Sequence, residues 1–225
     1  LEHITDRTAA VFVETLQGEA GAIAPQGDFL KQLQRRCVAT GTLLIADEIQ
    51  TGFGRTGKLF AFEHYDIVPD ILCIAKGMGG GMPIGAFISS KEIMNSLTNN
   101  PVLGHITTFG GHPVCCAASY ATLQVLLDEK LIEQVEEKEK LFRELLVHPA
   151  IKSIHGKGLL LALEFDSYDQ NKMIIDACIE NGVITDWFLF NAHSMRIAPP
   201  LTITSEEIRE ACGIILKCVK AINNR

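Results

Sequence analysis

Three charged residues follow short apolar runs in the first third of the chain. Asp47 and Glu48 come directly after the run Leu-Leu-Ile-Ala at 43–46, and Lys76 follows Ile-Leu-Cys-Ile-Ala at 71–75. Runs of this length between turn residues are typical of buried strands in a parallel sheet. Because open α/β sheets bind ligands at the carboxyl ends of their strands, we expect Asp47 and Lys76 to lie at a ligand-binding edge.

A carboxylate and an amine at one sheet edge each need a partner, since an unpaired charge beside apolar strands is costly. The two groups can pair with each other, or they can hold a ligand that requires both. Pyridoxal 5'-phosphate (PLP) is such a ligand, because its aldehyde condenses with a lysine amine and its ring nitrogen needs a carboxylate to stay protonated. The charges alone leave both possibilities open.

The spacing of Gly52, Gly54 and Gly57 spells G-x-G-x-x-G, the pattern of dinucleotide-binding proteins. In those proteins the pattern follows its strand directly, opens a helix and is answered by an acidic residue at the end of the next strand. Here residues 47–51 intervene and the next strand ends in Lys76. An NAD-dependent oxidoreductase is therefore only a remote alternative. A P-loop is excluded because neither glycine run is followed by Gly-Lys-Ser or Gly-Lys-Thr.

Five motifs, in order and spread over nearly the whole chain, together resemble the class III (ornithine- and acetylornithine-type) PLP-dependent aminotransferases. They are VETLQGEAG from Val13, ADEIQTGFGRTG from Ala46, AKGMGGGMPIGA from Ala75, TTFGGHP from Thr107 and MRIAPPLTIT from Met195. The resemblance implies an α/β protein of PLP-dependent transferase fold type I. It also implies that this chain corresponds to the C-terminal portion of such an enzyme. We expect the phosphate loop, the ring-stacking aromatic residue and a carboxylate-binding arginine to lie in the other half.

The resemblance gives Lys76 the role of the lysine that binds the PLP aldehyde and later moves the substrate proton. Asp47 is then the partner of the pyridine nitrogen, Ile49 packs on the ring face and Gln50 hydrogen-bonds the ring hydroxyl. A structural role for Ile49 in the core is nearly as good an explanation of its apolar side chain. Thr108 resembles the threonine that reaches the cofactor phosphate of the neighbouring subunit, which implies a homodimer.

The pair Glu19 and Arg196 resembles the gate of ornithine-type enzymes. There the glutamate screens the arginine in one half-reaction and swings away in the other, so that the arginine takes the carboxylate of an acceptor such as 2-oxoglutarate. The sequence departs from the family in two places, because Thr15 replaces the usual proline and His112 the usual asparagine.

The resemblance implies an aminotransferase that moves an amino group from an ω-amino donor, ornithine or N-acetylornithine, to the 2-oxo acid 2-oxoglutarate. A 4-aminobutyrate (GABA) or other ω-amino acid transaminase is the alternative within this class. An aminomutase of the glutamate-semialdehyde type is an alternative of another class, and the pair Glu19 and Arg196 disfavours it because it indicates a dicarboxylate acceptor. A protein that only binds its ligand is disfavoured by Lys76.

Composition and charge limit the partners. The 225 residues carry a formal net charge of −7, so we expect neither nucleic acid nor a membrane surface as a partner. No apolar run reaches the ~18 residues of a membrane-spanning helix. The seven cysteines form no C-x-x-C pair and the seven histidines show no zinc-like spacing, so we expect reduced thiols, no metal site and a cytoplasmic protein.

Periodicity predicts a larger domain over 1–146 and a smaller α+β domain over 147–225. In the first, strands over 9–14, 43–46, 71–75 and 85–89 form a mainly parallel sheet, with helices over 29–39, 113–129 and 131–146. We expect the charged run at 133–140, in the last of these helices, to form a solvated face. In the second, two strands over 151–155 and 159–165 are joined by a turn at 156–158. Short strands at 183–185 and 195–197 separate two helices, which capping boxes open at Ser167 and Thr204.

Overall fold

The computed structural model describes residues 1–100, 102 and 105–223, and their contacts divide them into two compact units. The first unit holds Leu1–Thr15, Pro25–Phe53 and Lys58–Lys130. The second holds Leu16–Ala24, Gly54–Gly57 and the described chain from Leu131 onward. Two short segments from the N-terminal part of the sequence thus belong to the second unit. The division into domains at residue 146 stays a prediction.

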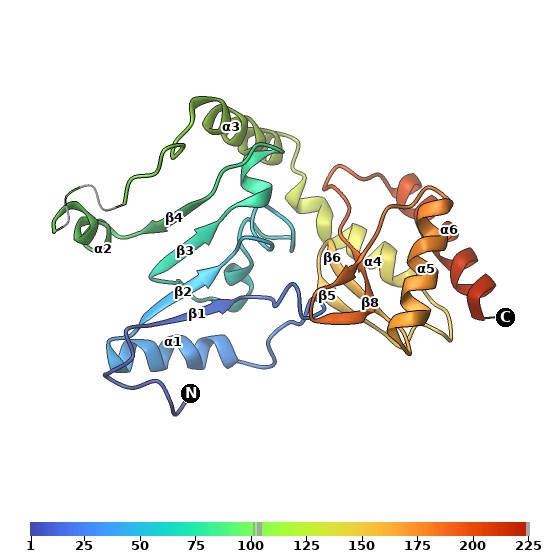
Figure 1. The fold of residues 1–225 in the computed structure, drawn as a ribbon, viewed down its shortest axis with the longest axis horizontal. Helices are drawn as coiled ribbons and strands as arrows, with labels where there is room; N and C mark the ends of the chain where they lie inside the picture. The colour runs from blue at the N-terminus through green and yellow to red at the C-terminus, as the bar shows by residue number, and fades with distance from the viewer. Residues whose placement is uncertain (101, 103–104, 224–225) are drawn as a thin grey trace. The chain divides into compact units, whose positions relative to one another are not determined.

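The first unit contains a four-stranded sheet in the order β1-β2-β3-β4 (Figure 1). Its strands are β1 (Ala10–Glu14), β2 (Leu43–Asp47), β3 (Ile71–Ile74) and β4 (Ala86–Ser89). The first three strands run parallel, whereas β4 runs antiparallel to β3. The carboxyl ends of β1, β2 and β3 therefore meet at one edge of the sheet.

Helix α1 (Phe29–Thr40) covers β1 and β2 with an apolar face (Figure 1). It ends at Gly41, whose φ of 68° closes the helix with N–H contacts to the carbonyls of Cys37 and Val38. The other helices of the unit are η1 (Ala61–Tyr65), η2 (Lys76–Gly79), α2 (Lys91–Asn95), η3 (Ser96–Thr98) and α3 (Pro113–Asp128). Ala46, Leu72 and Ile74 form a second buried cluster directly below the edge that carries Asp47 and Lys76.

The second unit contains an antiparallel sheet in the order β5-β6-β8-β7. Its strands are β5 (Ser153–Lys157), β6 (Leu160–Glu164), β7 (Trp187–Phe188) and β8 (Asn191–Ile197). Its helices are η4 (Ile132–Gln134), α4 (Val135–Leu145), α5 (Tyr168–Glu180) and α6 (Ser205–Asn223). Among the described residues, no helix is long and apolar enough to cross a membrane.

Strand β6 is buried on both faces, because Leu160 to Leu163 are all at most 3% exposed. On one face Leu160 and Ala162 pack against Leu16, Ala22 and Phe188. The loop between Leu16 and Ala22 is closed by paired main-chain hydrogen bonds between Gln17 and Ile23, at 2.9 and 3.0 Å. This packing fixes a loop from early in the sequence onto the second sheet.

Three sequence expectations for this unit are wrong. Strand β5 continues to Lys157, so the turn lies at Gly158 and Leu159 and not at 156–158. Gly156 stays in the strand with a φ of +108°, where a Cβ would lie 2.1 Å from the carbonyl oxygen of Leu160. Residues 183–185 form no strand.

The charged run at 133–140 is not wholly solvated, because Lys138 is only 9% exposed and donates to the carbonyl of Leu201 at 2.6 Å.

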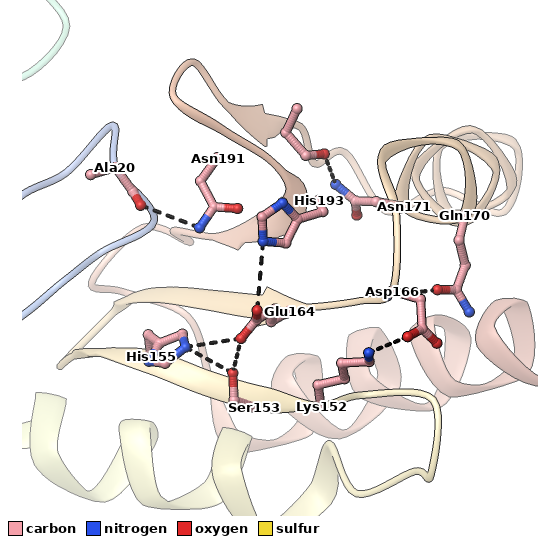
Figure 2. Close-up of polar contacts among 11 residues, drawn as sticks. Ala20, Lys152, Ser153, His155, Glu164, Asp166, Gln170, Asn171, Asn191 and His193 are labelled. Atoms are coloured by element: carbon pink, nitrogen blue, oxygen red, sulfur yellow. Dashed lines mark hydrogen bonds and ion pairs between the residues drawn. The ribbon is translucent and has the colours of Figure 1, made fainter.

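Polar side chains cluster on strands β5, β6 and β8 of the second sheet, as Figure 2 shows. Glu164 Oε2 accepts from Ser153 Oγ and lies 3.1 Å from His155 Nε2, and Glu164 Oε1 lies 3.5 Å from His193 Nε2. These contacts join β5, β6 and β8 through one carboxylate. In the part of the chain that the structure describes, no three His, Cys, Asp or Glu side chains are arranged to hold a metal ion.

The hydrogen bond from Ser153, followed by the contact with His155, lowers the pKa of Glu164 below its usual 4.5. A carboxyl with a lowered folded-state pKa stabilises the fold above its unfolded pKa and loses that contribution as the pH falls through the folded value. We therefore expect Glu164→Gln to lower the free energy of unfolding by about 1 kcal/mol at pH 5.5 and by much less at pH 3.

Urea unfolding of both proteins at stepped pH values measures this difference. Glu180→Gln, a change of an exposed glutamate at the end of α5, serves as the control and should leave stability unchanged throughout. A wild-type advantage over Glu164→Gln that stays constant from pH 5.5 to pH 3 would contradict the assigned role.

Candidate active site

Asp47 and Lys76 lie at the same edge of the first sheet. Asp47 is the last residue of β2 and pairs in register with Cys73 of the parallel strand β3. Lys76 follows three residues after Cys73, just beyond the end of β3. The carboxyl ends of two adjacent parallel strands thus carry one carboxylate and one amine, as the sequence predicts.

The backbone of Lys76 is held in an unusual conformation. Its φ is +44°, in the left-handed region that side-chain-bearing residues rarely adopt. Such strain persists only where the surroundings impose it, and it is concentrated at functional sites. Here the surroundings are the end of β3 and a glycine loop. At Gly80, whose φ is +56°, an added Cβ would lie 2.0 Å from Thr122 Oγ1 of α3, so a residue with a side chain there would have to displace Thr122.

Asp47 is half-buried and its carboxylate is oriented by its own turn. Oδ1 of Asp47 accepts from the main-chain N–H of Ile49 at 2.9 Å. Burial, and after it the negative charge of Asp47, raise the pKa of the Cys73 thiol on the paired strand. The hydrogen bond from Ile49 thus engages Oδ1, one of the two carboxylate oxygens of Asp47.

The neighbouring Glu48 is wholly buried and accepts four hydrogen bonds. Oε1 accepts from Thr15 Oγ1 at 2.9 Å and from the N–H of Phe62 at 2.8 Å. Oε2 accepts from Thr51 Oγ1 and from the N–H of Ala61 at 3.0 Å. Four donors around two oxygens suit an ionised carboxylate, which can only accept. Glu48 thereby ties the ends of β1 and β2 and the start of η1 together, next to Asp47.

Glu19 and Arg196 form a two-point ion pair within the second unit. Arg196 Nη1 lies 3.2 Å from Glu19 Oε1, and Nη2 lies 3.0 Å from Oε2. Both side chains are about four-fifths buried, at 20% and 22% exposed. The paired fork geometry is the strong, orientation-specific form of this contact. The structure thus brings together the two residues that the sequence predicts as a gate, from positions 177 residues apart.

The segment before β8 surrounds the rest of the Arg196 side chain. Asp186 Oδ1 lies 3.0 Å from Nε, and Nη2 also donates to the carbonyl of Trp187 at 3.3 Å. The guanidinium carbon lies 4.6 Å above the centre of the buried Phe188 ring, a cation–π arrangement. Sequence reasoning missed these groups, because nothing in their spacing indicates that the β7–β8 turn folds them onto Arg196.

The remaining predicted site residues lie in the first unit. Ile49 and Gln50 follow Asp47 and are both partly exposed. Thr108 is exposed in the turn that precedes α3, within the described residues from 105 onward. Thr15, which the sequence marks only as a departure from the family pattern, is wholly buried against Glu48. The replacement of a proline, which has no donor, by a threonine with a hydroxyl was the sign in the sequence that this position makes a hydrogen bond.

The chemistry of this edge fits PLP. An exposed lysine and a half-buried carboxylate end adjacent strands of one sheet, and a glycine loop follows the lysine. A carboxylate beside a pyridine nitrogen stabilises its protonated form, and a lysine amine can bind an aldehyde. Lys76 and Asp47 are the residues that would hold the cofactor from this chain.

Comparisons with known proteins agree with this chemistry. The family model for class-III aminotransferases matches residues 1–219. The ornithine aminotransferase from Toxoplasma gondii, for which partial occupancy of PLP at the active site is described, is 39% identical with a TM-score of 0.89. That match covers 97% of this chain and 52% of the other. The acetylornithine aminotransferase from Elizabethkingia anophelis is 40% identical with a TM-score of 0.85, covering 94% and 54%.

The chain therefore spans about half the length of the solved structures that it matches. The family model and these similarities confirm the predicted fold class, PLP-dependent transferase fold type I, and the predicted family. Class-III aminotransferases depend on PLP.

The cage around Glu48 generates a stability prediction. Thr15→Val keeps the shape of the side chain but removes the hydroxyl that donates to a buried carboxylate. A hydrogen bond to a charged group contributes about 1.5–3 kcal/mol, so we expect the free energy of unfolding to fall by about 2 kcal/mol. Chemical unfolding measures the change. Thr15→Ser, which retains the donor, should lose clearly less, and equal losses in the two variants would refute the role of the hydroxyl.

Proposed function

Because the chain belongs to the class-III aminotransferase family, we propose that the full-length protein is a PLP-dependent aminotransferase. Its donor is an ω-amine, ornithine or N-acetylornithine, and its acceptor is 2-oxoglutarate. The observation that carries this choice of acceptor is the two-point ion pair of Arg196 with Glu19. The ornithine and acetylornithine enzymes among the similar structures support the choice of donor over 4-aminobutyrate.

Lys76 and Asp47 divide the chemistry between them. PLP, when bound, withdraws electrons from the substrate carbon that carries the amino group. The Nζ of Lys76 would bind the aldehyde and, once the substrate amine has displaced it, would take the proton from the substrate carbon and deliver it to the former aldehyde carbon of the cofactor. Asp47 would hold the proton on the ring nitrogen through its carboxylate. Ile49 would contact the ring face, and Gln50 would hydrogen-bond the ring hydroxyl.

Glu19 and Arg196 let one enzyme accept two different substrates in turn. With Glu19 in place, the guanidinium is neutralised and offers no site for a second carboxylate, which suits an ω-amino donor. With Glu19 turned away, Arg196 binds a carboxylate of 2-oxoglutarate that the ω-amino donor lacks. An aminomutase, which needs no dicarboxylate acceptor, has no use for this pair.

Assembly and location follow from the same assignment. We propose a homodimer in which Thr108 of one protomer donates to the cofactor phosphate held by its partner, supported by the exposed hydroxyl in a glycine-containing turn. We also propose the cytoplasm as its location. All seven cysteines are free thiols, which suits a reducing compartment.

Borohydride reduction tests the role of Lys76. We expect reduction of the PLP-loaded protein to leave a pyridoxyl group on the peptide that contains Lys76, since reduction fixes the covalent link between amine and aldehyde. Mass spectrometry of the digest locates the label. Lys58→Ala, a change of an exposed lysine, should keep the label in place, whereas Lys76→Ala should abolish it. A label on any other lysine of the wild type would rule out the assignment.

Removal of the Glu19 carboxylate tests the acceptor. We expect Glu19→Ala to raise the rate of the half-reaction with glutamate relative to that with the ω-amine by about tenfold, because a competing carboxylate worth about 1.4 kcal/mol is gone. Single-turnover absorbance measurements with each donor give the ratio. Gln17→Ala, an exposed change in the same loop, controls for loop disturbance. A ratio equal to that of the wild type would eliminate the gate.

A further inference from the structure

The carboxylate of Glu19 accepts hydrogen bonds from a main-chain donor as well as from Arg196. The main-chain donor is the N–H of Leu189, which lies 3.1 Å from Oε2. Oε2 therefore accepts from both Leu189 and Nη2 of Arg196, while Oε1 accepts from Nη1. The three donors converge on the two oxygens of one carboxylate.

These donors do not depend on Glu19 for their position. Asp186, the Trp187 carbonyl and the Phe188 ring hold the guanidinium from its other sides. The main-chain N–H of Arg196 donates to the carbonyl of Asp186 at 2.8 Å, which fixes the segment before β7 to β8. Leu189 is the first of two residues that join β7 to β8, so the strand pairing sets the direction of its N–H.

Withdrawal of Glu19 would leave a preformed site for a carboxylate. The Phe190 N–H donates to the main-chain carbonyl of Glu19 at 3.0 Å, and this bond does not involve the side chain. The carboxylate of Glu19 can thus turn away while its backbone stays attached. Nη1 and Nη2 of Arg196 and the Leu189 N–H would then lack the acceptor that they share in this structure.

We propose that the Leu189 N–H is a third donor of the acceptor site, and that the substrate carboxylate takes the place of the Glu19 carboxylate. One oxygen accepts from Arg196 Nη1, and the other accepts from both Nη2 and Leu189. This inference rests on the proposed function. It adds a source of specificity for a carboxylate over a terminal amide. The NH2 group of an amide is a donor and would face one of these donors, whereas both oxygens of a carboxylate accept.

Proline at position 189 removes the donor with little disturbance. Leu189 is 73% exposed, and its φ is not in the left-handed region. Proline is favoured at the first central position of common turns, and the strand residue Phe188 before it has the extended backbone that proline requires. In a Glu19→Ala background the Leu189 N–H has no described acceptor left, so proline there breaks no bond within the protein.

Calorimetric titration of the PLP-loaded, full-length protein with glutarate, an unreactive dicarboxylate, tests the proposal. In the Glu19→Ala background, we expect Leu189→Pro to weaken glutarate binding by about tenfold or more, as for loss of a hydrogen bond to a charged group. The matched control is Leu189→Ala, which removes the same side chain but keeps the N–H and should bind within about twofold of the background. Equal affinity of the proline and alanine variants overturns the proposal.

A third variant separates this inference from the proposed function. Arg196→Lys in the same background should weaken glutarate binding whether or not Leu189 contributes. If Arg196→Lys has no effect, the acceptor assignment itself fails. If Arg196→Lys weakens binding and Leu189→Pro does not, the Leu189 contact alone fails.

Amide hydrogen exchange provides a second measurement that needs no proline. In the Glu19→Ala protein, we expect exchange at the Leu189 amide to be faster than in the wild type and to slow when glutarate is added. If saturating glutarate leaves the exchange rate of the Leu189 amide unchanged, the proposal is overturned, even if Leu189→Pro is too unstable to titrate.

Discussion

A buried carboxylate, Glu48, sets the geometry of the candidate active site. Removing a charge from water is costly unless hydrogen bonds replace the lost hydration. Glu48 meets that requirement with four donors drawn from the end of β1, the turn after β2 and the start of η1. Because all four must converge on one side chain, these segments cannot move independently. Asp47 is the residue before Glu48, so these hydrogen bonds also restrict the backbone that carries Asp47.

The first sheet fixes the position of Asp47 relative to that of Lys76. Parallel pairing places Asp47 level with Cys73, and the chain then turns immediately into the glycine loop. The positive φ of Lys76 shows that the backbone is strained directly after β3, at the residue that carries the amine. A carboxylate on a rigid turn next to a lysine in an enforced conformation is the arrangement expected of a preorganised site.

Much of this could be predicted from the sequence, for identifiable reasons. The strands that end in Asp47 and Lys76 are short apolar runs, and the capping box of Thr204 and Glu207 forms as its spacing indicates, with contacts of 2.8 and 3.2 Å. The β5–β6 turn was misplaced because Gly156 looks like a turn residue, whereas its close approach to Leu160 requires a glycine inside the strand. Lys138 was read as solvated because its carbonyl acceptor, on Leu201, is distant in sequence. The contacts of Arg196 with Asp186, Trp187 and Phe188 likewise depend on the β7–β8 hairpin, which is too short to leave a pattern in the sequence.

Glu19 and Glu48 show how the same functional group can serve opposite purposes. The donors of Glu48 come from the end of β1, the turn after β2 and the start of η1, and they share this one carboxylate as their acceptor. A small molecule in its place would lose the covalent link to β2 through which Glu48 holds these segments. The donors of Glu19 are instead held by other groups, with Asp186 and Phe188 fixing Arg196 and the β7–β8 turn fixing Leu189. Exchanging one carboxylate for another at such a site preserves both charge and hydrogen bonds, so the net free-energy change is small. The proposed gate would have to open in each catalytic cycle, which requires that near balance. Glu19 meets the requirement because its donors are held by other groups, whereas Glu48 does not.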